Sequence, residues 1–329
     1  MELVAKRTLH LMSGRAHVGL AEEIGKHLDV NLTEANLGDF SNGEIRCRFG
    51  ENIRGADVFI VQAHAAANGR SVNDALMEQL IMIDAAKRAS AKRITAVCPV
   101  FGYARQDRKA EGREPITAKA VADMLQAVGV SRVLSIDLHS GQIQGFFDVP
   151  CDHLTALPML IDHVSASIGP DLVVVAPDAG RVKVADRFAR HLGADLAIVS
   201  KRRPKGTVDT VEVGDVVGAE FVQGNPCVLV DDMIMTGGTI IAAAEQLHAH
   251  GASSVLVAAT HGYFTGSAIE KLRDSPVDRL VVTNTVPLPP AKAIDKIEVL
   301  SVAPIIANVI DAVFEDKSVS ELFDGENQS

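Results

Sequence analysis

The chain has 329 residues, of which 47% are hydrophobic and 22% are charged, and its formal net charge is −10. This composition is typical of a globular protein of about two domains with well-filled cores. The acidic balance argues against a protein that binds nucleic acid through a basic surface.

Targeting segments and metal-binding cysteine clusters are also disfavoured. The first residues, Met1 to Arg7, are not followed by a long apolar segment, and the sequence contains no run of about 20 apolar residues. The four cysteines lack the close spacing of a zinc site. Scattered cysteines of this kind are typical of reduced thiols. We therefore expect a cytoplasmic protein with no membrane partner.

Short β-rich runs alternate with longer helical patterns along the chain. We expect strands at residues 8–12, 58–62, 94–98, 133–137, 172–176, 196–200, 227–230, 255–260, 280–284 and 297–301. We expect helices between them at residues 72–88, 117–128, 182–192 and 240–250. Such alternation forms βαβ units, so the predicted fold class is α/β, with mainly parallel sheets flanked by helices. A boundary near 154–158 would give two domains.

The first cationic motif lies in the loop that follows the strand at 94–98. Arg105, Arg108, Lys109 and Arg113 fall within nine residues of an otherwise acidic chain. Guanidinium groups bind phosphate oxygens in pairs, so this loop suits a polyphosphate. A solvated basic loop without a ligand is the alternative.

Two carboxylates and a histidine follow predicted strands at positions that suit a metal ion. Asp137 and His139 are two residues apart at a strand end, so their side chains share one face. Together they can hold a divalent ion such as Mg²⁺ that takes phosphate oxygens as other ligands; a structural histidine is the alternative. Asp178 lies in a later strand-to-helix turn, where it could equally be a helix N-cap and nothing more.

A second cationic run leaves the strand at 196–200 and reads Lys201-Arg202-Arg203-Pro204-Lys205-Gly206. A run of charges is usually a solvated face. Its position at the end of a parallel strand favours a mobile flap that closes over a catalytic site.

The most informative stretch follows the apolar strand at 227–230 and reads Asp231-Asp232-Met233-Ile234-Met235-Thr236-Gly237-Gly238-Thr239. A glycine-rich loop that leads from a strand into a helix brings backbone N–H groups together at a phosphate. Asp231 and Asp232 repel phosphate at short range, so they need sugar hydroxyls or a hydrated Mg²⁺ as partners. The stretch predicts a sugar phosphate site, and a tight turn with exposed acids is the alternative.

Taken together, the motifs closely resemble those of the ribose-phosphate pyrophosphokinase (PRPP synthetase) family, in its phosphate-activated bacterial and animal class. The resemblance covers nearly the whole chain, and the motifs occur in the family's order and approximate spacing. It is carried by residues 40–44, 52–57, 73–78, 103–107, 137–147, 177–180, 201–203 and 231–239.

The resemblance implies two similar domains of the type I phosphoribosyltransferase kind. Residues 6–156, joined by a C-terminal helix near 312–324, would contact ATP and effectors, and residues 157–311 would hold ribose 5-phosphate. It also implies homodimers assembled into a hexamer. The implied reaction transfers the β,γ-diphosphoryl group of ATP to the C1 hydroxyl of ribose 5-phosphate. It gives PRPP and AMP for nucleotide biosynthesis, with Mg²⁺ as the cofactor.

The resemblance also assigns roles to individual residues of the nucleotide and metal sites. Adenine would be contacted from a neighbouring subunit, and the ATP-binding positions are Phe40, Asn42, Gly43, Glu44, Arg105 and Gln106. The metal-associated positions are His139 and Asp178, with Asp137 as a further group beside them. The catalytic cations of the flexible loop are Lys201 and Arg203.

The remaining implied roles concern the sugar phosphate and regulation. The ribose 5-phosphate positions are Arg203, Asp231, Asp232, Met235, Thr236, Gly237, Gly238 and Thr239. The positions at which phosphate and ADP would act as effectors are Arg54, Ser318 and Ser320.

The chain departs from the family pattern at three places. Met235 stands where the family usually has Asp, and it cannot accept the same hydrogen bonds, so we expect a weakened ribose 5-phosphate site. Arg181 stands where many members have a second Gly, which would alter the turn or add a phosphate contact. The stretch 63–72 is a few residues longer than usual, and we expect an extended surface loop there.

Two other functions stay open at this point. A catalytically weakened regulatory or structural subunit of a PRPP synthetase assembly is favoured by Met235 alone, since Lys201, Arg203 and His139 are present. A phosphoribosyltransferase that uses PRPP has the same kind of loop, but a single-domain transferase would not need the cationic run 105–109. Release of AMP from ATP in the presence of ribose 5-phosphate distinguishes these functions.

Overall fold

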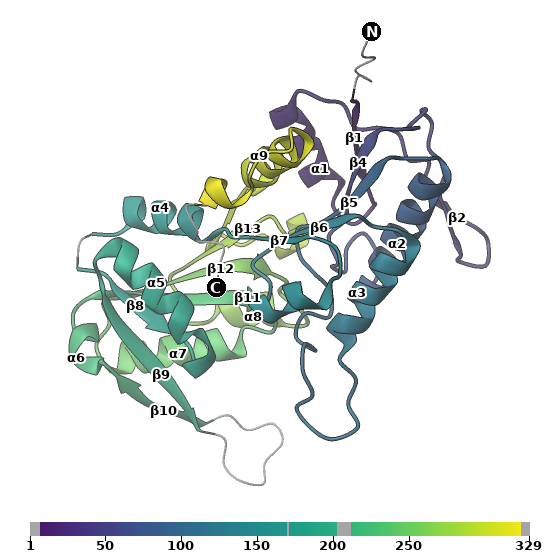
Figure 1. Ribbon diagram of the computed structural model, residues 1–329. Coiled ribbons are helices and arrows are strands. Elements are labelled where there is room, and N and C mark those ends of the chain that lie inside the picture. The colour runs from purple at the N-terminus through teal and green to yellow at the C-terminus, as the bar shows by residue number, and fades with distance from the viewer. Residues whose placement is uncertain (1–6, 170, 203–211, 324–329) are drawn as a thin grey trace. The chain divides into compact units, whose positions relative to one another are not determined.

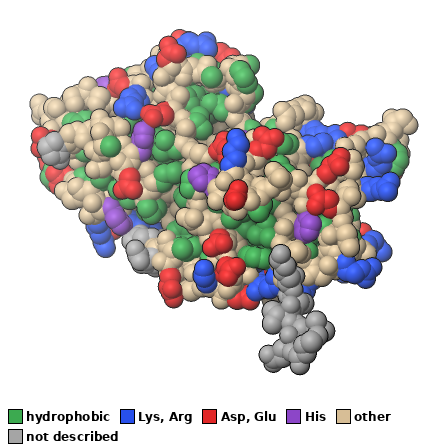
Figure 2. Space-filling model, turned by 90° about the horizontal axis from the view of Figure 1, so that it is seen from above, with side chains coloured by type: hydrophobic (Ala, Val, Ile, Leu, Met, Phe, Trp, Pro, Cys, Tyr) green, Lys and Arg blue, Asp and Glu red, His purple; other side chains and the backbone are tan. Residues whose placement is uncertain are grey.

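The three-dimensional structure is a computed structural model that describes residues 7–169, 171–202 and 212–323, with the backbone alone at 201–202 and 212–214. Figure 1 shows helices packed on the sheets. Within this part of the chain no helix is both long and apolar enough to cross a membrane. Figure 2 shows acidic and basic side chains interspersed over the visible face.

The chain divides into two compact units. The first unit takes the residues up to Thr155, the short segment Thr285–Pro287 and the residues from Ser301 onward. The second unit takes Ala156–Asn284 and Leu288–Leu300. The chain therefore forms most of the first unit, then the second unit with a short segment of the first at 285–287, and ends in the first unit.

The first unit contains a parallel sheet of five strands in the order β1-β4-β5-β6-β7. These strands are β1 (Leu9–Ser13), β4 (Asp57–Val61), β5 (Arg93–Cys98), β6 (Arg132–Ile136) and β7 (Cys151–Leu154). A separate antiparallel hairpin is formed by β2 (Gly38–Asp39) and β3 (Ile45–Arg46). The helices of the unit are α1 (Val18–Leu28), α2 (Val72–Arg88), α3 (Thr117–Val128), η1 (Gly141–Phe146), α9 (Ala303–Phe314) and η4 (Ser320–Phe323).

The first sheet is buried because helices cover both of its faces. All five residues of β4 are buried, as expected for a parallel strand between two helical layers. Helices α2 and α3 pack on one face through apolar side chains that include Leu80, Val121 and Leu125. Helices α1 and α9 lie side by side on the other face (Figure 1).

The second unit contains a sheet of seven strands in the order β10-β9-β8-β11-β12-β13-β14, parallel except for the edge strand β10. The strands are β8 (Val173–Ala176), β9 (Asp195–Arg202), β10 (Glu212–Val217), β11 (Pro226–Ile234), β12 (Ser254–Gly262), β13 (Arg279–Thr283) and β14 (Ile297–Leu300). The helices are α4 (Leu157–Ser167), η2 (Ala179–Arg181), α5 (Val182–Leu192), α6 (Ala219–Val222), α7 (Gly238–Ala249), α8 (Ala268–Arg273) and η3 (Pro290–Lys292).

The second sheet has its core against α7 and α8. Ile240 and Leu247 of α7 and Leu272 of α8 belong to one buried cluster with the apolar residues of β8, β11 and β12. The predicted α/β class with mainly parallel sheets is confirmed. The predicted helices at 72–88, 117–128 and 182–192 also occur with those bounds.

Strand β11 is longer than its apolar residues predict. It continues from Val230 to Ile234, because Asp231, Met233 and Ile234 pair with residues of β12. The expectation that the strand ends before the two carboxylates is therefore wrong. Hydrogen bonding to a central neighbour strand outweighs the low preference of aspartate for strands.

The returning segment begins before the predicted 312–324. Helix α9 already starts at Ala303, and its apolar side chains, among them Ile306 and Ile310, are fully buried in the first unit. The burial of this apolar stripe explains why the whole helix belongs to the first unit.

A cluster of four charges holds the end of α9 to the first sheet. Asp57, which starts β4, is 4% exposed, and its carboxylate accepts hydrogen bonds from Arg7 Nη2 at 3.1 Å and from Arg93 Nε at 2.8 Å. Both arginines also bond to Asp316, which follows α9, with N···O distances of 2.6 Å. The cluster joins four distant segments of the chain through opposite charges.

We predict that Asp57→Asn lowers the free energy of unfolding by on the order of 2 kcal/mol, because it removes the buried charge between two arginines that are themselves partly solvated. Thermal unfolding of the whole chain measures this loss. The control is Asp84→Asn, which removes an exposed carboxylate paired with Arg88 one helical turn away. Equal melting temperatures for the two variants would contradict the structural role of Asp57.

Candidate functional site

The second unit gathers an arginine and two carboxylates where β8 and β11 lie side by side. Arg181 ends the short helix η2 that follows β8, and its Nε lies 3.2 Å from Asp231 Oδ1. Its Nη2 lies 3.0 Å from Asp232 Oδ2. The three side chains are between 9% and 15% exposed, so the ion pairs are largely shielded from water.

The electrostatics of this group are dominated by burial. Removal from water raises the pKa of Asp231 well above its usual range, and the adjacent Asp232 carboxylate raises it further. Arg181 acts in the opposite direction and lowers the pKa of Asp231, which favours the ionised form. The guanidinium therefore compensates a charge that the sheet would otherwise disfavour.

The predicted loop from strand to helix follows Ile234, the last residue of β11, two residues after Asp232. Gly237 has a φ of 75°, in the left-handed region that favours glycine, and forms the N-cap of α7. Gly238 and Thr239 begin the helix, so their backbone N–H groups lie at its positive end, where anions bind. Thr236 is exposed, and the Met235 carbonyl accepts a hydrogen bond from the Thr265 N–H at 2.8 Å. This hydrogen bond holds the Met235 backbone to the segment that follows β12.

Asp178 does cap the short helix η2. Its Oδ1 accepts a hydrogen bond from the Gly180 N–H at 2.9 Å, two residues after the end of β8. The capping interpretation is therefore confirmed, while a role at a metal ion stays a prediction.

The predicted adenine residues of the first unit lie in the loop between β2 and β3, which extends away from the sheet (Figure 1). The Phe40 ring is 53% exposed, which is unusual for a large apolar side chain. Gly43 has a φ of 89°, and the Glu44 N–H donates to Asn42 Oδ1 at 3.2 Å. The loop is therefore ordered by its own hydrogen bonds while it presents an aromatic ring to solvent.

A buried carboxylate positions this hairpin, and the sequence did not reveal that role. Glu78 of α2 is 1% exposed and accepts hydrogen bonds from the Arg15 N–H at 2.6 Å and from Gln62 Nε2 at 3.0 Å. The Arg15 guanidinium bonds to the same carboxylate and donates to both oxygens of Asp39 at 2.9 and 3.0 Å. Asp39 directly precedes Phe40, so the chain of bonds runs from the core to the aromatic loop. A glutamate on the buried face of a predicted helix was the available signal.

A buried histidine supports the cationic loop in the same way. His64 is fully buried, and its Nδ1 accepts the Gly102 N–H at 3.1 Å. The ring proton is therefore on Nε2, which donates to Gln79 Oε1 at 2.8 Å. A side chain at Gly102 would come within 3.0 Å of the His64 Cβ, so glycine permits this close approach.

The expectation of a surface loop at 63–72 is wrong for its first residues, because residues 63–65 are buried.

The loop that these contacts support carries the predicted phosphate-binding residues. Arg105 and Gln106 are exposed, as are Arg108 and Lys109. Gln106 Oε1 accepts a hydrogen bond from the Thr117 hydroxyl at the start of α3. The cationic side chains thus extend from a loop whose two ends are fixed.

The predicted metal residues are divided between the two units. Asp137 and His139 follow β6 in the first unit, and Asp178 follows β8 in the second. Asp137 has a φ of 38°, which is rarely adopted outside glycine and holds the turn after β6 in a strained conformation. Among the described residues no three His, Cys, Asp or Glu side chains cluster as a protein-only metal cage would require. One or two carboxylates suffice for a Mg²⁺ ion that is otherwise bound by phosphates and water, and each of these side chains carries a donor that such an ion accepts.

The remaining predicted residues are the two loop cations and the effector positions. Arg203 lies outside the described residues, and Lys201 is described by its backbone in β9. The proposed effector positions Arg54, Ser318 and Ser320 are exposed residues of the first unit. Their regulatory role stays a prediction.

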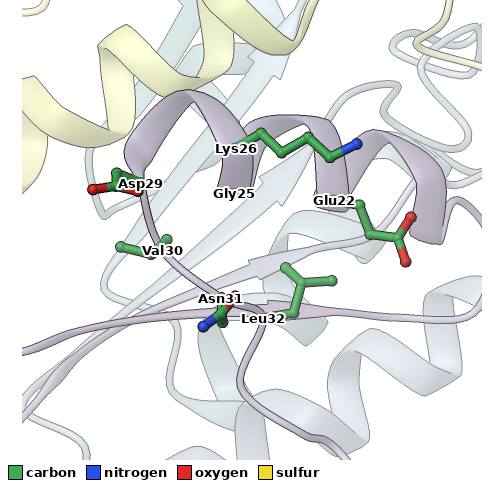
Figure 3. Close-up of a pocket in the computed structure, with 7 residues that line it drawn as sticks. All are labelled: Glu22, Gly25, Lys26, Asp29, Val30, Asn31 and Leu32. Atoms are coloured by element: carbon green, nitrogen blue, oxygen red, sulfur yellow. The ribbon is translucent and has the colours of Figure 1, made fainter.

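A pocket of about 440 Å³ lies beside α1, outside the predicted site. Figure 3 shows its lining, which consists of Glu22, Gly25, Lys26, Asp29, Val30, Asn31 and Leu32. No residue predicted to bind substrate, metal or effector belongs to this lining. This pocket is therefore separate from the predicted site residues.

Burial of His64 predicts a specific pH dependence. It lowers the pKa of His64 from 6.5 to about 4, so the unfolded chain binds a proton between these values that the folded chain does not. Stability should be constant above pH 6.5 and should fall as the pH drops, by about 2 kcal/mol between pH 7 and pH 5. Urea unfolding of the wild type and of His64→Gln at both pH values measures this contribution.

The neutral Gln side chain should remove that part of the pH dependence, so the free energies of unfolding of the two proteins converge at pH 5. His27→Gln, at an exposed histidine, is the control for the exchange of histidine for glutamine itself. A constant difference between wild type and His64→Gln at both pH values would contradict the role assigned to His64.

Comparison with known proteins agrees with the motifs. The N-terminal domain of ribose phosphate pyrophosphokinase matches residues 9–129, and the phosphoribosyl synthetase-associated domain matches residues 198–324. The chain is 53% identical over 325 residues to the ribose-phosphate pyrophosphokinase of Streptomyces avermitilis, covering 98% of each protein. It is 50% identical over 317 residues to that of Caldanaerobacter subterraneus, covering 96% of this chain and 98% of the relative.

A solved structure extends the likeness to three dimensions. The crystal structure of phosphoribosylpyrophosphate synthetase from Mycobacterium smegmatis matches with a TM-score of 0.86 and 47% identity, covering 94% of this chain and all of the other. The identity and coverage of these matches leave one conclusion: the chain belongs to the ribose-phosphate pyrophosphokinase family.

Proposed function

We propose that the chain transfers the β,γ-diphosphoryl group of ATP to the C1 hydroxyl of ribose 5-phosphate and thereby produces PRPP and AMP. One observation carries this proposal beyond family membership. In the second unit two carboxylates near the end of β11 are followed, a few residues later, by a glycine loop and the N-terminus of α7. Acceptors for sugar hydroxyls and donors for a phosphate are therefore offered by one continuous segment.

The two ends of ribose 5-phosphate would bind different parts of this segment. The 5-phosphate would accept hydrogen bonds from the backbone N–H groups of Gly238 and Thr239 and from the hydroxyls of Thr236 and Thr239. The ribose hydroxyls would donate to the carboxylates before the loop. The sugar would then lie along the end of β11, with its C1 hydroxyl free to attack the β-phosphorus of ATP.

ATP would bind mainly through the first unit. The exposed ring of Phe40 offers a face on which adenine can stack, with Asn42, Gly43 and Glu44 beside it in the loop. Arg105 and Gln106 would contact the nucleotide from the cationic loop. Since the hairpin presents its ring outward, we propose that it serves a neighbouring subunit, in homodimers assembled into a hexamer.

We infer that Asp137, His139 and Asp178 are the side chains that serve Mg²⁺, which when bound would neutralise and orient the charged phosphates. The protein's own task is then to position the C1 hydroxyl in line with the β-phosphorus and to stabilise the charge that develops there. Lys201 and Arg203 are the proposed groups for this charge. The backbone of Lys201 pairs with Val213 in the ladder between β9 and β10, so one end of the proposed loop is anchored in the sheet.

Regulation is proposed for the first unit. The resemblance to the phosphate-activated class suggests that phosphate and ADP act at Arg54, Ser318 and Ser320. All three residues are exposed and therefore accessible to small anions. Measuring activity with and without inorganic phosphate addresses this part of the proposal.

Incubation with ATP, Mg²⁺ and ribose 5-phosphate should release AMP, and Lys201→Ala should lower kcat. Loss of one donor to developing charge typically lowers the rate by ~10²–10³, while the KM values should change little. Quantifying AMP over time for both proteins tests the activity and the role of the lysine. Lys183→Ala, which changes a lysine of α5 outside the proposed site, is the control.

Two results would contradict this proposal at different points. Near-normal kcat in Lys201→Ala would remove the lysine from the mechanism but leave the reaction intact. Absence of AMP from a folded and assembled wild type would instead favour a regulatory or structural subunit.

Met235 allows a separate test of the phosphate loop. Met235→Asp should lower the KM for ribose 5-phosphate, because an aspartate can order the loop through hydrogen bonds that methionine cannot accept. The KM for ATP, measured in the same assay, should stay unchanged. An unchanged or raised KM for ribose 5-phosphate would mean that the methionine does not weaken the site.

A further inference from the structure

The contact between Arg181 and the two carboxylates differs from a simple surface ion pair, because it is largely buried and involves three charged groups. One guanidinium joins two neighbouring carboxylates, with Nε at 3.2 Å from Asp231 Oδ1 and Nη2 at 3.0 Å from Asp232 Oδ2. Asp231 Oδ1 also accepts the Asp232 N–H at 2.8 Å. The side chains are nearly buried, so the attraction is screened far less than it would be at the surface.

The position of Arg181 is fixed by its backbone. Its N–H donates to the Asp178 carbonyl at 3.1 Å, and the residue forms both the end of η2 and the N-cap of α5. The guanidinium is therefore delivered to the carboxylates from a rigid turn. A charge placed in this way is part of the site in the absence of any ligand.

Charge balance determines which ligand the carboxylates can take. Two ionised carboxylates side by side carry a charge of −2, which would attract a divalent cation strongly. Arg181 adds one positive charge to the group, and a cation at the pair would also meet the guanidinium at close range. Arg181 contacts Oδ1 of Asp231 and Oδ2 of Asp232. A carboxylate oxygen can accept more than one hydrogen bond, so these contacts are compatible with a hydroxyl donor.

We propose that Arg181 is the internal counter-ion of the Asp231–Asp232 pair and takes the place of a divalent cation there. It acts as a positioning residue that offsets part of the charge of the pair and holds both side chains toward the vicinal hydroxyls of a sugar, which they then contact directly. The proposal rests on the proposed function only for the identity of that sugar. Metal at the separate donors Asp137, His139 and Asp178 is unaffected by it.

The test compares two substitutions that differ in charge. Arg181→Gln keeps polar donors but removes the charge, and Arg181→Lys keeps the charge on a different head group. Thermal unfolding of the full chain is measured in EDTA and in millimolar MgCl₂. Arg190→Ala is the matched control, because that arginine follows η2 in α5 but pairs with Asp186 at an exposed position.

We expect Arg181→Gln to lower the melting temperature in EDTA by about 5–10 °C, because two buried carboxylates lose their counter-ion. MgCl₂ should restore about half of that loss, by binding where the guanidinium was. The melting temperatures of wild type, Arg181→Lys and Arg190→Ala should respond to MgCl₂ alike and weakly. Adding Asp232→Asn to Arg181→Gln should abolish the response to Mg²⁺, because one carboxylate has been neutralised.

The proposal is overturned if Arg181→Gln melts like the wild type in EDTA, or gains no more from MgCl₂ than the wild type does. Should Arg181→Gln not fold in EDTA, folding only when MgCl₂ is added supports the proposal, and failure in both conditions overturns it. These measurements need no turnover. A negative result therefore leaves AMP release untouched, and absence of AMP release leaves the counter-ion role standing.

Discussion

Arginine held against buried carboxylate is the interaction on which both units depend. Glu78 in the first unit is bonded by Arg15, and the acid pair of the second unit is bonded by Arg181. Each carboxylate lies in an interior that disfavours charge, so its geometry is acceptable only while the arginine is present. Breaking either contact would leave an uncompensated buried charge, so the arginine and its carboxylates keep their positions. The loops next to them are held in place by these contacts.

The two contacts serve surfaces of opposite character. In the first unit the guanidinium relays order outward to Asp39 and the exposed Phe40, where a planar ring is offered to a ligand. In the second unit the guanidinium is directed at the acceptors themselves and adjusts their charge. The same kind of contact, an arginine bonded to a buried carboxylate, thus orients the β2–β3 hairpin in one unit and offsets the charge of the carboxylates in β11 in the other. His64 provides an uncharged counterpart, since it fixes the cationic loop through hydrogen bonds alone.

Local patterns predicted α2, α3, α5 and α7 and the loop at Gly237, because the periodicity and the glycines that define them are close in sequence. The supporting contacts were missed because they join distant residues, such as Arg15 and Glu78, which are 63 positions apart. The extension of β11 was missed for a related reason, since it depends on pairing with β12. For Arg181 the sequence indicated an unusual residue but could not name its partners, which depend on the adjacency of β8 and β11.

The return of the chain to the first unit has a consequence for biosynthesis. Helix α9 and the bonds from Arg7 and Arg93 to Asp316 are available only after nearly the whole chain has left the ribosome. The second unit, apart from its last strand, is complete well before that point. An N-terminal half that emerges first must therefore wait with the α9-binding face of its sheet uncovered, while the unit synthesised later can fold ahead of it. Chaperone capture of nascent chains should accordingly be strongest for this waiting face, around α1.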